Sequence, residues 1–317
     1  MIRRVALLAA VFALVALATS RVALVAHELV GHGLLAVAFG ADLVSYKLFL
    51  FGGGWVSYRW YGAPGGGAAL AVALGGIALE AVAGAVALAV APRCRGRVAR
   101  VGFLAIATIL LLHAGFYLAA GAHHGFGDGR SVHEALGAWR PLLVVPVSVV
   151  VVAGGFLLAS RLAREVSDWV EGKPLARAGQ IAAAAVLAAA AHGALTFGER
   201  VLTRDDNYAR IMEHENVRLV ARDLDRFAAQ ARLARGRPPT AEELAAARAR
   251  LEKEHRPFPL APLLAVALGL ACVAGLWRAV TRSRDPSSEA RWRAALAPAA
   301  ICAGAVALVA ILQALAP

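Results

Sequence analysis

The strongest constraint on the fold of this chain is a series of apolar blocks, each about 20 residues long and made mostly of Ala, Val, Leu and Gly. A helix of that length crosses a hydrocarbon core of about 30 Å. Backbone N–H and C=O groups in lipid must be paired within the protein, and the blocks lack the alternation of barrel strands. The sequence therefore predicts an all-α polytopic membrane protein with about seven or eight transmembrane helices. We expect it in a bacterial cell (inner) membrane.

The apolar blocks also predict how the chain is organised. The first block covers residues 5–39 and could form one long helix or two passes, and the later ones cover 68–91, 101–122, 141–160, 180–196, 262–280 and 294–315. Four regions result: a core at 1–140, additional transmembrane helices at 141–197, an extramembrane insert at 198–258 and a C-terminal helix pair at 259–317.

Two segments between the blocks have patterns of their own. Residues 43–51 and 55–61 are rich in aromatic and β-branched residues and flank a run of three glycines at 52–54, which predicts a small β-hairpin. The stretch at about 198–256 is polar and alternates in charge sign. Within it, Thr240 precedes Glu243 by three residues, the spacing of a capping box that opens a helix. We therefore expect the insert to be helical.

The net charge of +12 would suggest nucleic acid as a partner of a soluble protein. Here the basic residues cluster in short loops at 93–100, 161–177 and 278–293, as in cytoplasmic loops of membrane proteins. We therefore expect the lipid bilayer, and no nucleic acid, as the partner. If every block crosses once, these loops share the inner side and the first block ends outside. Two passes in the first block would reverse this arrangement.

The residues with the clearest chemical meaning lie near the end of the first block, in Ala26-His27-Glu28-Leu29-Val30-Gly31-His32-Gly33. This motif is close to the His-Glu-x-x-His of zincins, in which two histidines four residues apart share a helix face. Here the spacing is five, so a metal site requires a one-residue π-bulge, for which Gly31 is a plausible place. Glu28 would then polarise a metal-bound water. A variant interpretation makes Glu28 and His32 the ligands.

A zinc site of this kind needs a third protein ligand. The three cysteines are widely spaced and form no Cys-x-x-Cys pair, so the ligand is sought among other residue types. The best candidate is Asp128, just past the apolar block at 101–122, because two further passes return the chain to the side of the membrane where His32 lies. Rival ligands are His123, His124 and His133.

Two further sets of polar residues interrupt the apolar blocks. His113, Tyr117 and His124 form one polar stripe at helical spacing, which predicts either orientation of the metal ligands and a water path or hydrogen bonds between helices. Glu80 lies among small residues that allow helices to approach closely. We expect Glu80 to be a hydrogen-bonded buried acid, with a role as third ligand as the alternative.

Together these features resemble the site-2 protease family, the intramembrane zinc metallopeptidases. The resemblance covers residues 5–135 and rests on the motif from His27 to His32, the glycine-rich hairpin and the Asp128-Gly129 pair. It implies that His27, His32 and Asp128 bind Zn²⁺, that Glu28 is the catalytic base, and that the hairpin presents an edge to an unwound substrate segment.

The chain departs from the family in two respects. Three residues instead of two separate Glu28 from His32, and the usual Asn-x-x-Pro ahead of the Asp-Gly pair is absent. Family members also place the metal towards the cytosol, whereas the basic loops place it outside if the first block crosses once.

The sequence therefore predicts a zinc metalloendopeptidase that cleaves peptide bonds of membrane-protein or membrane-associated substrates, as in regulated intramembrane proteolysis. Three rival hypotheses remain. The first is a non-catalytic, zinc-binding membrane scaffold, and the second is a zinc or proton transporter that uses the stripe from His113 to Asp128. The third is a zincin of the kind that processes prenylated proteins, with Glu80 as a ligand.

Overall fold

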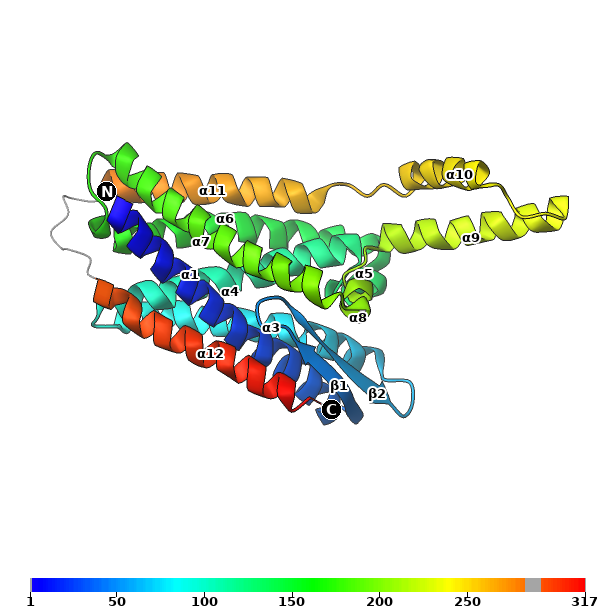
Figure 1. The fold of residues 1–317 in the computed structure, drawn as a ribbon, viewed down its shortest axis with the longest axis horizontal. Coiled ribbons are helices and arrows are strands. Elements are labelled where there is room, and N and C mark those ends of the chain that lie inside the picture. Colours follow the sequence, from blue (N-terminus) through cyan, green and yellow to red (C-terminus); the bar gives the residue numbers. More distant parts are fainter. Residues whose placement is uncertain (1, 283–291, 317) are drawn as a thin grey trace.

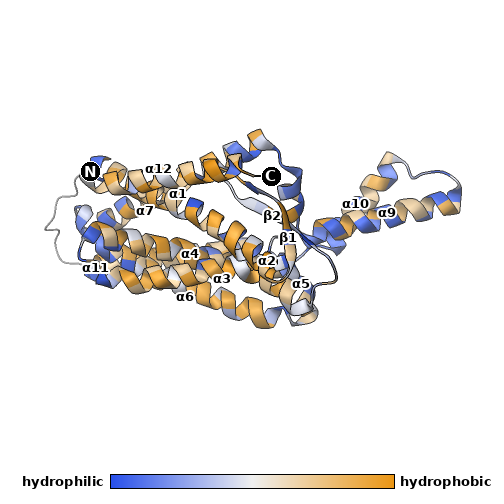
Figure 2. Ribbon diagram, turned by 90° about the horizontal axis from the view of Figure 1, so that it is seen from below, coloured by the Kyte–Doolittle hydropathy of each residue, from blue (hydrophilic) through white to orange (hydrophobic). Residues whose placement is uncertain are grey.

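A computed structural model describes residues 2–282 and 292–316, and the described residues form a bundle of long helices (Figure 1). Seven of these helices are long and apolar enough to cross a membrane, which confirms the predicted all-α polytopic fold. They span Ile2–Ala38, Gly66–Arg93, Arg97–His124, Pro141–Trp169, Pro174–Thr203, Leu260–Arg282 and Leu296–Ala314. Hydrophobic residues follow the bundle along its length, and hydrophilic residues gather at its two ends and on an arm that projects from one of them (Figure 2).

The first apolar block forms one continuous helix and not two passes. It consists of α1 (Ile2–Val25), a π-helical segment η1 (Ala26–Leu34) and the short α2 (Leu35–Ala38). The N-terminus lies at one end of the bundle, and the hairpin that follows α2 lies towards the other (Figure 1). Residues 93–100 and 161–177 meet at the N-terminal end through ion pairs such as Arg97–Asp168 and Arg100–Glu165. The motif in η1 is therefore remote from these basic loops.

The other spanning helices are α3 (Gly66–Val90), α4 (Arg97–His124), α6 (Pro141–Val166), α7 (Pro174–Thr203), α11 (Leu260–Arg282) and α12 (Leu296–Ala314). The largest group of buried apolar side chains joins α1, α4, α6, α7 and α11, and includes Leu8, Val101, Val166, Ile181 and Val280. Lipid tails are as apolar as these side chains, so close packing between the helices, and not removal from water, holds them together. Packing between the helices therefore fixes the position of α1, which carries the motif.

The predicted hairpin is confirmed, with strands a few residues from the expected ends. β1 (Ala41–Leu48) pairs antiparallel with β2 (Gly54–Trp60), with Leu48 opposite Gly54 and an irregularity after Leu43. The outer edge of β1 is held by the last helix, α12. The Tyr46 hydroxyl donates to the Leu312 carbonyl at 2.8 Å, and the Leu48 N–H donates to Gln313 Oε1 at 2.6 Å.

The polar insert is helical, as predicted, and begins later than residue 198 because α7 continues to Thr203. It comprises α8 (Asp206–Ile211), α9 (Glu215–Arg235) and α10 (Ala241–Glu254), and α9 and α10 form the arm that projects beyond the bundle (Figure 1). The predicted capping box is present, since the Thr240 side chain accepts from the Glu243 N–H at 3.2 Å and Glu243 accepts from the Thr240 N–H at 2.9 Å.

Candidate metal centre

The unusual spacing of the two motif histidines is accommodated by a π-helix. Residues Ala26–Leu34 form this segment within the long first helix. In a regular α-helix, side chains five residues apart point well apart, but the wider π turn returns them to one face. The rings of His27 and His32 accordingly lie edge to face, with centroids 4.8 Å apart. The expected π-bulge is therefore confirmed and covers the whole motif.

The π-helix packs backbone to backbone against α3. A Cβ atom on Gly31 would lie 2.5 Å from the Gly76 Cα, and one on Gly75 would lie 2.0 Å from the Gly31 carbonyl oxygen. Only glycines allow so close an approach. It brings the Val72 carbonyl of α3 within 2.7 Å of His32 Nδ1. The small residues in both segments thus place polar groups of α3 beside the motif.

Asp128 reaches the same place from a turn at the end of α4. Gly125 ends α4 with φ +67°, and Gly127 follows with φ +53°, two conformations that favour glycine. The chain then starts α5 (Gly129–Leu136) directly after Asp128. A Cβ on Gly129 would lie 2.3 Å from the Gly121 carbonyl carbon, so the turn is folded tightly back on α4. The Asp-Gly pair is therefore explained by the geometry of this turn.

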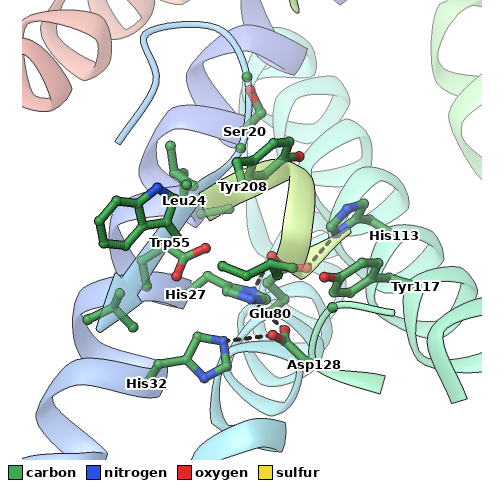
Figure 3. Close-up of a pocket in the computed structure, with 18 of the residues that line it drawn as sticks. Ser20, Leu24, His27, His32, Trp55, Glu80, His113, Tyr117, Asp128 and Tyr208 are labelled. Atoms are coloured by element: carbon green, nitrogen blue, oxygen red, sulfur yellow. Dashed lines mark hydrogen bonds and ion pairs between the residues drawn. The ribbon is translucent and has the colours of Figure 1, made fainter. Parts of the chain in front are cut away.

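The three predicted ligands converge (Figure 3). Asp128 Oδ2 lies 2.8 Å from His27 Nε2, and Asp128 Oδ1 lies 3.3 Å from His32 Nε2. One ligand atom from each residue lies within 4.8 Å of the other two, so this group could hold a metal ion. Burial opposes ionisation of Asp128, but the hydrogen bond with His27 and the nearby His32 ring outweigh it and lower the pKa of its carboxyl. Asp128 is therefore a carboxylate at neutral pH.

In both histidines, Nδ1 already contacts an acceptor oxygen, so Nε2 is the nitrogen that could bind a metal. His32 Nδ1 donates to the Val72 carbonyl, and His27 Nδ1 lies 2.9 Å from Glu80 Oε1. A carbonyl or carboxylate oxygen only accepts, so both Nδ1 atoms carry the proton. His32 Nε2 is buried and makes no hydrogen bond in the described part of the chain. This donor set fits a metal ion, because a metal-binding histidine commonly donates its other N–H to an acceptor outside the ligand set.

Glu28 lines the same cavity as the three ligands but belongs to no ligand group. The cavity has a volume of about 660 Å³ and is bordered by η1, β2, α3, α4 and the turn that carries Asp128. The Glu28 carboxyl is buried there, and its Cγ lies close to Gly54 of β2. The variant in which Glu28 and His32 are the ligands is not favoured, since Asp128 and His27 complete the group with His32.

The structure does not bring the rival histidines to this group. His123 Nε2 lies 3.0 Å from the carbonyl of Phe258, just before α11, and His124 Nε2 accepts from the N–H of Ala261, in its first turn, at 3.4 Å. His133 Nδ1 lies 3.0 Å from the Ala122 carbonyl. These histidines turn away from the cluster because the end of α4 packs against α5 and α11. They are therefore not part of the group formed by His27, His32 and Asp128.

Glu80 is not part of that group either. Its carboxylate contacts the Nδ1 side of the His27 ring, whereas Asp128 is on the Nε2 side. The two ring nitrogens point in different directions, so an ion bound at Nε2 lies away from Glu80. The expectation of a buried, hydrogen-bonded acid is confirmed, and its second oxygen lies 2.7 Å from His113 Nδ1.

Arg21 is a site residue that sequence reasoning missed. Although it interrupts the first apolar block, its side chain is buried and lines the cavity. Its guanidinium donates to three carbonyl oxygens of the hairpin turn, those of Phe49 at 2.6 Å, Phe51 at 3.1 Å and Gly52 at 2.6 Å. Placing a charged residue inside an apolar helix costs free energy, so such a residue usually has a function. This signal could have identified Arg21 from the sequence.

Glu199 of α7 holds the same turn from the other side. Its carboxylate accepts from three consecutive backbone N–H groups, those of Leu50 at 2.6 Å, Phe51 at 2.7 Å and Gly52 at 2.8 Å. The turn before β2 is thus fixed between α1 and α7. Both carboxylate oxygens and all three N–H groups are satisfied by this arrangement.

Replacing Glu199 with alanine is expected to loosen the hairpin turn. Each partly buried N–H that loses its acceptor costs up to about 1–3 kcal/mol, so local opening should become at least about tenfold easier. Hydrogen exchange measured by mass spectrometry over residues 49–53 would report this. Glu252→Ala is the matched control, because that carboxylate pairs with Arg248 on the exposed α10. Unchanged exchange in Glu199→Ala would contradict the assigned role.

The short helix α8 forms part of the cavity wall through Tyr208 and Ile211. Asp205 caps it and also accepts from the Trp55 indole at 3.1 Å and pairs with Lys47 at 3.0 Å, both in the hairpin. At its other end, the Ile211 carbonyl accepts from the Gly127 N–H at 2.9 Å, next to Asp128. Tyr208 of α8 faces the pocket that contains the cluster (Figure 3). The insert therefore bridges the hairpin and the Asp-Gly turn.

Comparison with protein families, with curated proteins and with solved structures finds no match to this chain.

Proposed function

We propose that this protein is an intramembrane zinc metalloendopeptidase of the site-2 protease kind, which cleaves peptide bonds of membrane-protein substrates. The single observation that carries the proposal is the convergence of His27, His32 and Asp128 in a cavity that Glu28 also lines. Two histidines, an aspartate and a glutamate are expensive to place among apolar helices unless they serve a function.

Zinc is the metal that this donor set fits best. Catalytic zinc sites use three protein ligands drawn from histidine nitrogens and carboxylate oxygens and leave a fourth position open. When bound, zinc supplies Lewis-acid chemistry, since it polarises a carbonyl and lowers the pKa of a water molecule. His27 and His32 would offer Nε2, and Asp128 would offer a carboxylate oxygen.

Glu28 is the residue proposed to move the proton. It follows the ligand His27 directly and lies in the shared cavity, yet its carboxylate is not required for the ligand group. A buried carboxylate beside the reacting groups can accept a proton from the attacking water and deliver it to the leaving amine. Helices, β2 and the turn that carries Asp128 border the cavity, so they would limit the access of lipid to the reacting groups.

The hairpin is proposed to hold the substrate. Gly54, Trp55, Val56 and Tyr58 of β2 line the cavity, and β2 pairs only with β1 among the described residues. An unwound peptide segment could add to the free edge of β2 through backbone hydrogen bonds. Arg21 and Glu199, which fix the turn before β2, would then keep that edge in register with the metal ligands.

The proposal predicts zinc binding that depends on Asp128. Detergent-purified wild type should contain about one zinc per chain, and Asp128→Ala should lose it, because two histidines alone form an incomplete site. Zinc per polypeptide measured by elemental analysis tests this. Asp225→Ala is the control, because that aspartate is exposed in α9. His123→Ala should also keep the metal.

Two results would contradict the zinc assignment. Absence of zinc from the wild type even after reconstitution would eliminate the metallopeptidase and leave a helical membrane scaffold with a polar cluster. Loss of zinc in His123→Ala but not in Asp128→Ala would mean that the ligand set is wrong.

A further inference from the structure

We propose that Glu80 is a positioning residue that holds His27 in the orientation needed for metal binding and couples it to His113. This inference rests on the proposed metal centre. It adds a carboxylate on α3 and a histidine on α4 that act through His27 and touch neither metal nor substrate.

Two residues of α3, Gly76 and Glu80, together fix the position of the His27 ring. A Cβ atom on Gly76 would lie 2.5 Å from His27 Nε2 and Cδ2, so the ring lies flat against the backbone of α3. Glu80, one helical turn further on, is 2.9 Å from Nδ1. The glycine leaves room for the ring, and the carboxylate fixes which nitrogen carries the proton. His27 Nε2 can then point only towards Asp128.

Glu80 itself is buried and needs its partners. A carboxylate inside a helical bundle is stable only when it is paired and hydrogen-bonded. His27 Nδ1 is 2.9 Å from Glu80 Oε1, and His113 Nδ1 is 2.7 Å from Glu80 Oε2. Each oxygen has its own donor, so the carboxylate cannot rotate without losing one of them. His113 therefore helps to fix the orientation that Glu80 presents to His27.

His113 is held in turn by α4. Its ring stacks on that of Tyr117, one helical turn on, with centroids 5.6 Å apart and planes 9° apart. Both residues line the cavity, and Figure 3 shows His113, Glu80, His27 and Asp128 as a continuous chain of contacts. His113 thus contacts Glu80 directly, and Tyr117 also lies beside the His27 ring, with centroids 6.5 Å apart.

Zinc affinity measured by chelator competition tests the role of Glu80. Partners of this kind change metal affinity by about 10–100-fold when they are replaced, so Glu80→Gln should bind zinc at least about tenfold more weakly than wild type. Glu165→Gln is the matched control, since that carboxylate pairs with Arg100 at the opposite end of the bundle. Equal affinity of Glu80→Gln and wild type would overturn the proposal.

A double-mutant cycle tests the coupling to His113. His113→Leu should weaken zinc binding in the wild type by less than Glu80→Gln does, and should have no further effect when Glu80 is already glutamine. Additive losses would mean that His113 acts by another route. His113→Leu removes one partner of the buried Glu80, so it should also lower the unfolding temperature. Zinc affinity is therefore compared at a temperature at which all four proteins are folded, which separates a loss at the site from general unfolding.

A readout without metal separates this inference from the proposed function. In metal-free protein with ¹⁵N-labelled histidine, the Nδ1 proton of His27 should exchange slowly in wild type and rapidly in Glu80→Ala. If the wild type binds no zinc, this measurement still decides whether Glu80 holds His27. Equal exchange in both proteins would refute it.

Discussion

Replacing Glu28 with glutamine is expected to abolish peptide-bond hydrolysis while zinc remains at about one per chain. Glutamine has nearly the same shape as glutamate and cannot accept a proton. General acid–base catalysis contributes about 10²–10⁴-fold, so the rate should fall by at least that factor. The metal should stay, because the ligand atoms are supplied by His27, His32 and Asp128. The measurement pairs zinc content with cleavage of a membrane-peptide library in detergent or proteoliposomes.

The same experiment distinguishes the remaining hypotheses. Glu134→Gln, an exposed change on α5, is the control and should cleave like wild type. Loss of zinc in Glu28→Gln would assign Glu28 to the ligand set, as in the variant with His32. Zinc in both proteins but cleavage in neither would favour a non-catalytic metal-binding scaffold. Ion flux in proteoliposomes would favour the transporter instead.

The fold and the ligand group were predictable because their signals are local. Apolar blocks of membrane-spanning length predict the helices, and three glycines between β-prone segments predict the hairpin. The spacing of His27 and His32 is incompatible with one face of a regular α-helix, so a shared metal predicts a π-helix. Asp128 followed from counting passes, since an odd number of crossings would have separated it from the motif.

The contacts that complete the cavity could not be predicted, because they join segments far apart in the chain. Arg21 and Glu199 are 178 positions apart, yet both bind the hairpin turn. The position of α8 depends on the contacts of Asp205 with Trp55 and Lys47 of the hairpin, about 150 residues earlier. The partners of His123 and His124 are likewise set by α11, more than 130 residues later. Such packing has no periodic signature in sequence.

Replacing Gly75 with alanine is expected to damage both the fold and the metal centre. The new Cβ would lie 2.0 Å from the Gly31 carbonyl oxygen, and backbone atoms cannot move aside as a flexible side chain would. Overpacking of this kind costs about 1–3 kcal/mol and sometimes more. To relieve the clash, α3 must move away from η1.

That movement would reach the ligands, because α3 supplies the groups that orient them. The Val72 carbonyl holds His32 and Glu80 holds His27, so separation of the helices lengthens both hydrogen bonds. We therefore expect Gly75→Ala to lower the unfolding temperature and to weaken zinc binding together. Gly269→Ala is the matched control, since that glycine lies in the apolar α11 with open space around it. A Gly75→Ala protein that unfolds earlier but binds zinc like wild type would show that the metal centre does not depend on the contact between η1 and α3.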